Sequence, residues 1–371
     1  MMYHQYEPTI TKEDIDAVSS YMNSGSWITE HKVTQKLQEE IQAYLGVAHA
    51  HCVVNGTIAI SIALLACGVK RGDEVLVPDL TMVATATACE LIGAKPIFID
   101  VAHDSLCMDA AKARKAVYKL RPKALIYVSL NGRWDTTGEM LRLFNDCRNY
   151  NIPVIEDAAQ SFGSRNVHGL IGKHAKVTTF SMSPHKAITS GQGGFIVTDD
   201  LLVGERVKRL KDFGRLEGGT DLHDTFGINA KFTDLQASLA LSQLQRIDSI
   251  VDRKKEIYAT YFKYLKDEPN LRFIGTYIGS SPWFVDIYTG LRDELAVMLR
   301  ENNIFTRPIY PTLSNQPMYN RNSMNLVAEE YSRLGLWLPS SLSLQDKDIR
   351  FICDKIKEFF DNFQKGIFGN K

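Results

Sequence analysis

Short apolar segments alternate with helical segments through about the first two hundred residues of this 371-residue chain. Apolar spacing predicts an amphipathic helix over Lys32–Leu45, with Val33, Leu37, Ile41 and Leu45 on one face. Further helices are expected at Asp14–Met22, Ile58–Cys67, Val83–Ile92 and Gly138–Tyr150. Strands are expected at 52–54, 74–78, 96–100, 124–130 and 153–156, and as a pair at 177–181 and 194–198. Strands separated by helices predict an α/β fold with a large, mostly parallel sheet covered on both faces.

The pattern changes after about residue 235. We expect one long helical region over 235–261, strands at 271–274 and 283–288, a helix at 293–301 and a final helix at 346–363. These elements predict a smaller α+β unit. Because the chain is longer than one hydrophobic core usually supports, we expect two domains, residues 1–247 and 248–371.

Composition excludes several classes of protein. Lys plus Arg and Asp plus Glu both number 43, and this balance argues against nucleic-acid binding. The N-terminus lacks a basic region followed by an apolar run, and the longest apolar stretch, Ile58–Val69, is too short to span a bilayer. The six cysteines form no CxxC pair, so neither a disulfide framework nor a metal site is expected. We therefore expect a cytoplasmic protein that is not bound to a membrane.

Two residues of the middle region suggest a specific chemistry. Asp157 follows the strand 153–156, and the carboxyl ends of such strands are where open α/β sheets bind ligands. Lys186 lies in a loop before the glycine-rich turn 191–194. Pyridoxal phosphate (PLP) needs a carboxylate against its ring nitrogen and a lysine that forms a Schiff base with its aldehyde. Taken alone, Asp157 could instead cap a helix, and a lone lysine is more often a solvated surface charge.

A second segment, Asn55-Gly56-Thr57, precedes the helix expected from Ile58. A helix N-terminus offers free N–H groups and a positive dipole end, which together bind phosphate. The Ser181 hydroxyl could contact the same phosphate. A plain helix N-cap by Asn55 or Thr57 explains this segment equally well when it is considered alone.

In combination these segments resemble the DegT/DnrJ/EryC1/StrS family of sugar aminotransferases, over nearly the whole chain. The family's SGT-x-A segment appears as residues 55–59, EDAAQ as 156–160, TFSF-x-x-x-K-x-x-x-x-GEGG as 179–194, and GFNYR-x-T-x-x-QAA as 227–237. Residues 24–28, Thr306-Arg307-Pro308 and 317–319 also match. Within the family the pattern is most similar to the GDP-perosamine synthase group.

The resemblance implies a PLP-dependent transferase of fold type I, like aspartate aminotransferase. It implies transfer of the amino group of L-glutamate to a keto group of a nucleotide-linked keto-deoxysugar, in a homodimer with composite active sites. Lys186 would be the Schiff-base lysine and proton shuttle, and Asp157 would pair with the ring nitrogen. The remaining implied cofactor contacts are Gln160 at the phenolic oxygen, Gly56, Thr57 and Ser181 at the phosphate, and Asn229 at the phosphate from the neighbouring subunit. Candidate substrate contacts are Trp27, His185, Lys231 and Arg307.

The sequence departs from the family pattern at several positions. Met82 stands where relatives carry an aromatic residue stacked on the cofactor ring, although a thioether can also lie against a ring. The HLYG segment is replaced by Ser129-Leu-Asn-Gly and followed by Arg-Trp-Asp135, in a region that lies near the substrate in relatives. Lys231 replaces an arginine and cannot grip an anion through two parallel hydrogen bonds. Gln192 replaces the glutamate of GEGG.

Other functions remain open at this point. The same fold could aminate another ketone, such as an inosose or a small phosphorylated ketone. Some relatives with histidine in place of the lysine are sugar dehydratases, but the alignment places Lys186, not His185, at the critical position. A non-catalytic binding protein is disfavoured by intact Asp157, Gln160 and Lys186. A dinucleotide oxidoreductase is disfavoured because no GxGxxG follows a strand.

Overall fold

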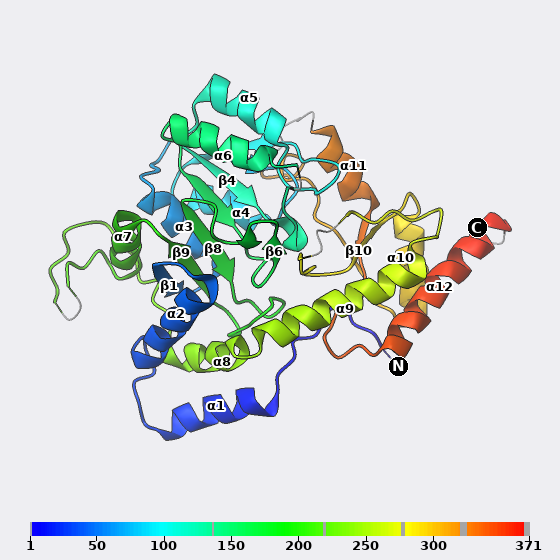
Figure 1. Ribbon diagram of the computed structural model, residues 1–371, viewed down its shortest axis with the longest axis horizontal. Coiled ribbons are helices and arrows are strands. Elements are labelled where there is room, and N and C mark those ends of the chain that lie inside the picture. Colours follow the sequence, from blue (N-terminus) through cyan, green and yellow to red (C-terminus); the bar gives the residue numbers. More distant parts are fainter. Residues whose placement is uncertain (1, 136, 218–219, 276–278, 320–324, 367–371) are drawn as a thin grey trace.

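The computed structural model describes residues 2–135, 137–217, 220–275, 279–319 and 325–366. Its main feature is a seven-stranded sheet with the order β1-β9-β8-β5-β4-β2-β3 (Figure 1). Strands β8, β5, β4, β2 and β3 run parallel, whereas β9 is antiparallel to both of its neighbours. The expected mixed, mostly parallel sheet is therefore confirmed. The strands are β1 (His49–Val53), β2 (Glu74–Pro78), β3 (Lys95–Ile99), β4 (Ala124–Val128), β5 (Val154–Asp157), β8 (Val177–Ser181) and β9 (Gly194–Thr198).

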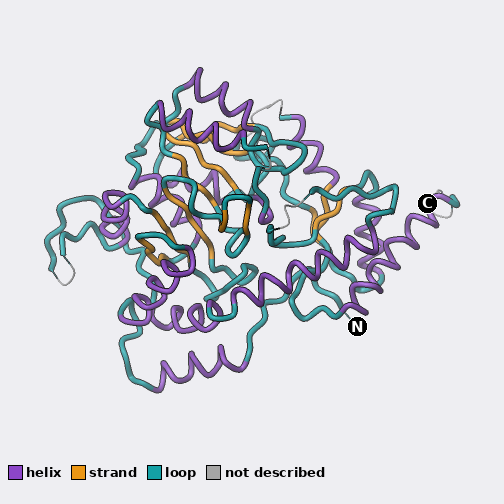
Figure 2. The backbone as a smooth tube through the Cα atoms, in the orientation of Figure 1, coloured by secondary structure: helices purple, strands orange, loops and turns teal. Residues whose placement is uncertain are grey.

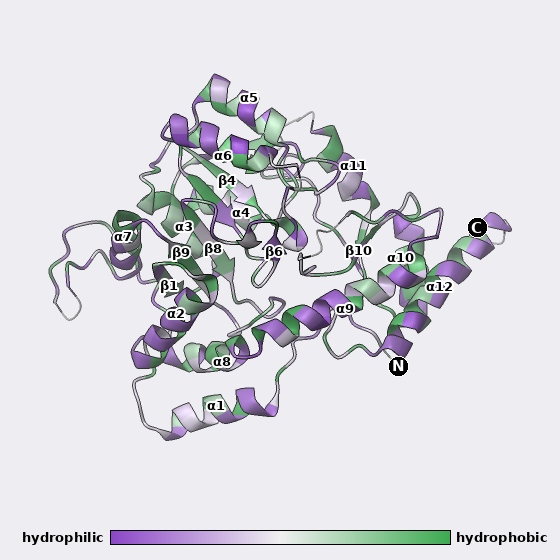
Figure 3. Ribbon diagram, in the orientation of Figure 1, coloured by the Kyte–Doolittle hydropathy of each residue, from purple (hydrophilic) through white to green (hydrophobic). Residues whose placement is uncertain are grey.

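Helices connect these strands and flank the sheet (Figure 2). They are α1 (Lys12–Asn23), α2 (Lys32–Leu45), α3 (Gly56–Ala66), α4 (Ala84–Leu91), α5 (Ala110–Leu120), α6 (Glu139–Asn149) and α7 (Leu201–Lys211), with a short 3-10 turn η1 (Leu130–Gly132). A hairpin of β6 (Arg165–Asn166) and β7 (Gly169–Leu170) follows β5. Helix α3 is almost wholly apolar and packs on β8 and β9, so the most hydrophobic residues gather around the sheet (Figure 3).

The expected smaller α+β unit is also present in the last third of the chain. A three-stranded antiparallel sheet has the order β10-β12-β11, and a separate buried cluster joins α9, α10 and α12. The long helix α9 extends from the region of the large sheet to α12, against which it packs (Figure 1). The elements are α8 (Asp234–Leu244), α9 (Ile247–Leu265), β10 (Asp286–Tyr288), α10 (Arg292–Glu301), β11 (Arg307–Pro308), α11 (Leu326–Leu334), β12 (Gly335–Trp337) and α12 (Asp346–Gln364). A domain boundary at residue 247 stays a prediction.

Two expectations for this part of the chain are wrong in detail. The single helical region over 235–261 is two helices, because Arg246 leaves helical geometry at φ −111° and its guanidinium pairs with both carboxylate oxygens of buried Asp14 at 2.7 and 2.8 Å. Residues 271–274 form no strand, since only Arg272 pairs with Tyr288.

Three helices of the structure, α5, α7 and α11, were not predicted from the sequence.

Two aspartates at the carboxyl ends of adjacent strands tie the last third of the chain to the large sheet. Asp79, directly after β2, accepts hydrogen bonds from the Ser314 N–H and hydroxyl, both at 2.7 Å. Asp100, directly after β3, accepts a hydrogen bond from the Ala328 N–H at 2.9 Å and so caps α11. Among the described residues, no helix is long and apolar enough to cross a membrane.

Candidate active site

Asp157 is the last residue of β5, at the carboxyl edge of the parallel strands. Its two oxygens accept hydrogen bonds from the Thr85 hydroxyl at 2.8 Å and the Ala159 N–H at 3.1 Å. Burial raises the pKa of Asp157, and the bonds from Thr85 and Ala159 and the charge of Lys186 only partly oppose that rise. A buried carboxylate held in this way favours a cationic partner, which the protonated ring nitrogen of PLP would be.

Lys186 lies in the loop between β8 and β9, close enough to Asp157 for their charges to interact. Burial lowers its pKa to about 8, Asp157 opposes that change, and Arg307 adds to it. About half of a lysine with this pKa is neutral at pH 8, and the neutral amine is the form that acts as nucleophile and base.

Trp283 contacts the loop that carries Lys186, and sequence analysis did not identify it as a site residue. Its ring centroid lies 3.9 Å from the Lys186 Nζ, and its indole N–H donates a hydrogen bond of 2.6 Å to the His185 carbonyl. The Trp283 carbonyl in turn accepts a bond of 2.9 Å from the Nζ of buried Lys254. One buried aromatic side chain therefore contacts both the backbone and the side chain of the loop that carries Lys186.

The structure brings together the expected phosphate-binding groups Gly56 and Ser181. Gly56 is the first residue of α3, capped by Asn55, whose side chain accepts from the Ile58 N–H at 2.9 Å. A Cβ added at Gly56 would lie only 3.0 Å from the Ser181 Cβ. The absence of a side chain therefore keeps the helix N-terminus open beside a hydroxyl, with Thr57 next along α3. This cradle fits a phosphate group.

Gln160, shortly after β5, is almost fully buried and its amide orientation is fixed. Its Oε1 accepts a hydrogen bond of 2.7 Å from the Asn131 N–H, and its Nε2 donates one of 3.4 Å to the Tyr310 hydroxyl. Tyr310 is coupled electrostatically to Asp157 and Arg307. Gln160 thus belongs to the same group of side chains as Asp157 and Lys186.

The other candidate residues divide between this site and a separate surface. His185 is exposed beside Lys186. The Arg307 guanidinium lies 5.7 Å from the Trp337 ring, and its charge lowers the pKa of both Lys186 and His185. Met82 is 43% exposed, three residues before Thr85. In contrast, Trp27 and Asn229 are exposed, and Lys231 is bound to Asp212 at 3.0 Å in a cleft between α2 and α7. Within the described part of this subunit, no hydrogen bond or ion pair joins Trp27, Asn229 or Lys231 to Lys186.

The replaced segment 129–134 is buried rather than open to solvent, with Ser129, Asn131, Arg133 and Trp134 each at most 3% exposed. It contacts the C-terminal part of the chain: the Asn131 side chain bonds to Phe284, and Arg133 bonds to Asp286. Asn131 and Arg133 therefore hold this segment against the C-terminal part of the chain.

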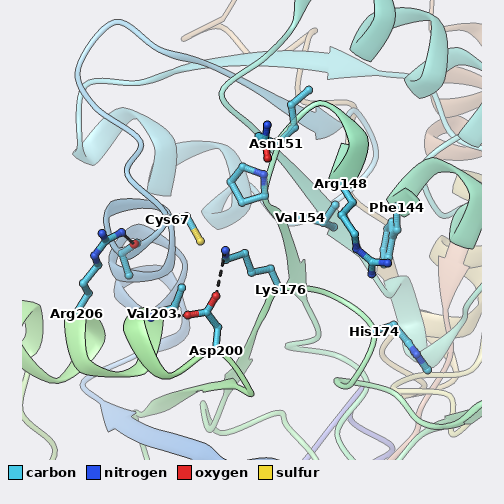
Figure 4. A pocket seen from close by; sticks show the side chains of 13 residues that line it. Cys67, Phe144, Arg148, Asn151, Val154, His174, Lys176, Asp200, Val203 and Arg206 are labelled. Carbon is cyan, nitrogen blue, oxygen red and sulfur yellow. Dashed lines mark hydrogen bonds and ion pairs between the residues drawn. The ribbon is translucent and has the colours of Figure 1, made fainter. Parts of the chain in front are cut away.

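A cavity of about 420 Å³ lies at the opposite edge of the sheet (Figure 4). Its lining includes Val154 and Lys176, at the beginning of β5 and β8, whereas Asp157 lies at the end of β5. Lys176 is paired with Asp200 at 3.1 Å, and Arg206 donates to the Ala66 carbonyl at 3.0 Å. Because these charges are satisfied within the protein, the cavity lacks the chemistry of the Lys186 site.

Comparison with known proteins identifies the chain. The model of the DegT/DnrJ/EryC1/StrS aminotransferase family matches residues 8–357. The chain belongs to this aminotransferase family. It is 31% identical over 362 residues to the GDP-perosamine synthase of Escherichia coli O157:H7, covering 96% of this chain and 98% of the relative. It is 30% identical to that of Vibrio cholerae, with the same coverage.

Solved structures agree with this assignment. The DesV protein of S. venezuelae, solved with a ketimine intermediate, superposes with a TM-score of 0.87 at 28% identity, covering 94% of each chain. The DegT/DnrJ/EryC1/StrS protein described here is therefore a PLP-dependent sugar aminotransferase with the expected fold-type-I architecture. The family assignment made from the motifs is confirmed.

Besides Trp283, sequence analysis missed Thr85, Tyr310 and Lys254 as neighbours of the site. Thr85 lies three residues after Met82, and its hydroxyl at that distance from Met82 was the available signal. Tyr310 lies between Pro308 and Pro311, two residues after the matched Thr306-Arg307-Pro308 segment. Nothing in the local pattern marks Lys254, which lies within the long helix α9.

Proposed function

We propose that this enzyme carries PLP on Lys186 and transfers the amino group of L-glutamate to the keto group of a nucleotide-linked keto-deoxysugar, as a GDP-perosamine synthase does. The observation that carries the cofactor assignment is the pairing of Lys186, with a pKa of about 8, and buried Asp157 at the carboxyl edge of the sheet. Similarity over the full length to two GDP-perosamine synthases supports the acceptor class.

The chain's own residues have distinct tasks in this proposal. When bound, PLP supplies an aldehyde for the amino group and a ring that withdraws electrons. Asp157 would pair with the ring nitrogen and favour its protonated form, and the Thr85 hydroxyl orients the Asp157 carboxylate. Gly56, Thr57 and Ser181 would hold the phosphate at the N-terminus of α3, Gln160 would donate to the ring's phenolic oxygen, and Met82 would contact the ring.

Lys186 Nζ is the general base. It accepts the proton from the α-carbon of glutamate and returns a proton in the acceptor half of the cycle. The low pKa keeps the free amine available, because a lysine at its ordinary pKa of about 10.4 would be almost fully protonated near pH 7. Trp283 holds the loop of Lys186, while Arg307 and His185 at the entrance contact the anionic substrates.

We further propose a homodimer in the cytoplasm, in which Asn229 of the partner subunit completes the phosphate site. Support comes from Asn229, which is exposed in this subunit, and from the exposed apolar side chains Trp27 (72%) and Phe226 (66%). Exposed apolar residues of this size suit an interface with another chain. Lys231 and Trp27 would then contact the nucleotide sugar bound in the partner's site.

The test has two parts. Borohydride reduction of PLP-loaded protein, followed by peptide mass spectrometry, should place the cofactor on Lys186, and Lys186→Ala should abolish this label. Incubation with glutamate and a panel of keto-sugar nucleotides should then release 2-oxoglutarate and an amino sugar. A label that persists in Lys186→Ala would overturn the cofactor assignment. Turnover only with inososes or small phosphorylated ketones, or loss of the sugar hydroxyl without an amino product, would overturn the acceptor assignment.

A further inference from the structure

Residues 131–133 bind, one after another, to the segment 281–286 that leads into β10. The Asn131 side chain accepts from the Phe284 N–H at 2.9 Å and donates to the Phe284 carbonyl at 3.0 Å. The Gly132 carbonyl accepts from the Ser164 hydroxyl at 2.7 Å, whose oxygen in turn accepts from the Ser281 N–H at 2.9 Å. Arg133 donates to both Asp286 oxygens at 2.6 and 2.8 Å. We call residues 131–133 the clamp.

The clamp needs its particular residues. Asn131 has φ +55° and Gly132 φ +77°, a left-handed backbone that asparagine and glycine adopt most readily. A Cβ on Gly132 would lie 2.1 Å from the Ser281 carbonyl oxygen, so the two segments touch through backbone. The Asn131 side-chain amide accepts from the Phe284 N–H and donates to the Phe284 carbonyl, as the backbone of a paired β-strand would.

The clamp ends at the active site. The Asn131 N–H donates to Gln160 Oε1 at 2.7 Å, which requires that the oxygen of the Gln160 amide face Asn131. The amide nitrogen must then face the other way, toward Tyr310. The bond from the Asn131 N–H is therefore the contact that sets the orientation of this amide.

We propose that Asn131 is a positioning residue: by fastening the loop after β4 to Phe284, it fixes the Gln160 amide so that one N–H donates to Tyr310 and the other is left for the cofactor. The inference rests on the proposed function, in which Gln160 donates to the phenolic oxygen of PLP. Trp283, which contacts Lys186, directly precedes Phe284 in the chain, so the clamp also fastens the segment that supports the lysine.

The test uses Asn131→Gly, which permits the left-handed backbone but removes the amide, and Asn131→Asp, which keeps the size and can accept from the Phe284 N–H but cannot donate to its carbonyl. The readout is the visible absorption of PLP-loaded enzyme titrated with pH. A hydrogen bond from Gln160 favours the ionised phenolic oxygen, so its loss should move the midpoint to higher pH. Gln160→Leu serves as reference, and Asn166→Gly, at a buried asparagine in the β6–β7 hairpin, serves as matched control.

We expect both Asn131 variants to shift the midpoint in the same direction as Gln160→Leu, with kcat falling about five- to tenfold, as for one lost hydrogen bond. Asn166→Gly should keep the wild-type midpoint. If an Asn131 variant loses thermal stability but keeps the wild-type midpoint, its role is structural only and the inference fails. If Asn131→Gly does not fold, Asn131→Asp decides. If Gln160→Leu itself leaves the midpoint unchanged, positioning of Gln160 is refuted, while borohydride labelling of Lys186 still tests the proposed function separately.

Discussion

At the scale of single residues, opposing charges around Lys186 tune its reactivity. Burial lowers its pKa to about 8, the Asp157 carboxylate favours the ammonium form, and the Arg307 guanidinium disfavours it. The Trp283 ring face at 3.9 Å also favours the ammonium form, since a cation is attracted to an aromatic face. The amine therefore stays basic enough to take up a proton, yet is available near neutral pH.

Arg307 and Asp157 should shift the titration of Lys186 in opposite directions. In the apoenzyme, labelling of Lys186 by acetic anhydride, followed by mass spectrometry across pH, should have its midpoint near pH 8. Arg307→Gln removes a cation and should raise this midpoint, whereas Asp157→Asn removes an anion and should lower it. Each shift should be below about one pH unit, because partly solvated charges interact by about 1 kcal/mol. Shifts of the same sign would contradict this electrostatic picture.

A conservative replacement should separate the charge of Lys186 from its action as a base. Lys186→Arg keeps a cation over Trp283 but cannot lose its proton near neutral pH. The reaction with glutamate in stopped-flow absorption should therefore slow by about 10²- to 10⁴-fold, the usual contribution of a general base. Lys95→Arg, at the exposed start of β3, is the control and should react as the wild type does. A near-normal rate in Lys186→Arg would assign the base elsewhere.

At the scale of elements, Asp234 joins the beginning of α8 to the beginning of α2. Its carboxylate accepts from the backbone N–H groups of His31, Val33 and Thr34 at 2.8–2.9 Å. Burial raises the pKa of Asp234, but these bonds and that from the Thr34 hydroxyl outweigh burial, and the net pKa is lowered. One side chain thus caps a helix that lies two hundred residues earlier in the sequence.

Removing this charge should give a pH-dependent loss of stability. Because the folded-state pKa is lowered, the stabilisation is complete above the unfolded pKa of about 3.9 and is lost as the pH falls through the folded-state value. Asp234→Asn should reduce the free energy of unfolding in urea at pH 7 by about 1–2 kcal/mol, as for a lost cap. The difference from wild type should shrink below about pH 4. Asp16→Asn, at an exposed position of α1, should leave stability unchanged at both pH values.

The buried ion pair between the loop after β4 and β10 should be costly to break. Arg133 and Asp286 are each 2% exposed, and the Tyr288 hydroxyl also donates to Asp286 at 2.6 Å. Arg133→Met leaves an uncompensated carboxylate, so we expect a loss of about 3–5 kcal/mol in urea unfolding. Arg142→Met breaks the exposed pair with Glu139 at 2.6 Å and should cost at most about 1 kcal/mol. Equal losses in the two variants would show that burial does not govern the effect.

The sequence was informative where chemistry follows local pattern. Strands β2, β8 and β9 and helix α2 have the expected bounds, and Asp157 lies at the strand end where the apolar run predicted it. The contacts between Trp283 and Lys186, and between Asn131 and Phe284, join residues about 100 and 150 positions apart. Such contacts arise from tertiary packing and leave no periodic signal in either segment. For the same reason, the bonds from Asn131 to Phe284 and from Arg133 to Asp286 could not be predicted, and a place for residues 129–135 near the substrate stays a prediction.

At the scale of the whole molecule, the proposed composite site can be tested by mixing two defective enzymes. If each site uses Lys186 of one subunit and Asn229 of the partner subunit, a hybrid of Lys186→Ala and Asn229→Ala subunits contains one intact site. Random subunit exchange should then restore about a quarter of wild-type activity, because about half of the dimers are hybrids with one good site in two. Sites built within one subunit would give no recovery. Mixing Lys186→Ala with Asp157→Asn is the control and should give none in either case.

The aspartates after β2 and β3 also bear on how this enzyme can be re-engineered. Asp79 holds Ser314, and Asp100 caps α11 at Ala328, so Ser314 and the start of α11 are both bonded to residues at the ends of large-sheet strands. A chimera that exchanges the C-terminal part between relatives would therefore separate these carboxylates from the loops they were matched to. Grafts intended to transfer acceptor preference should include the ends of β2 and β3 together with the C-terminal segment.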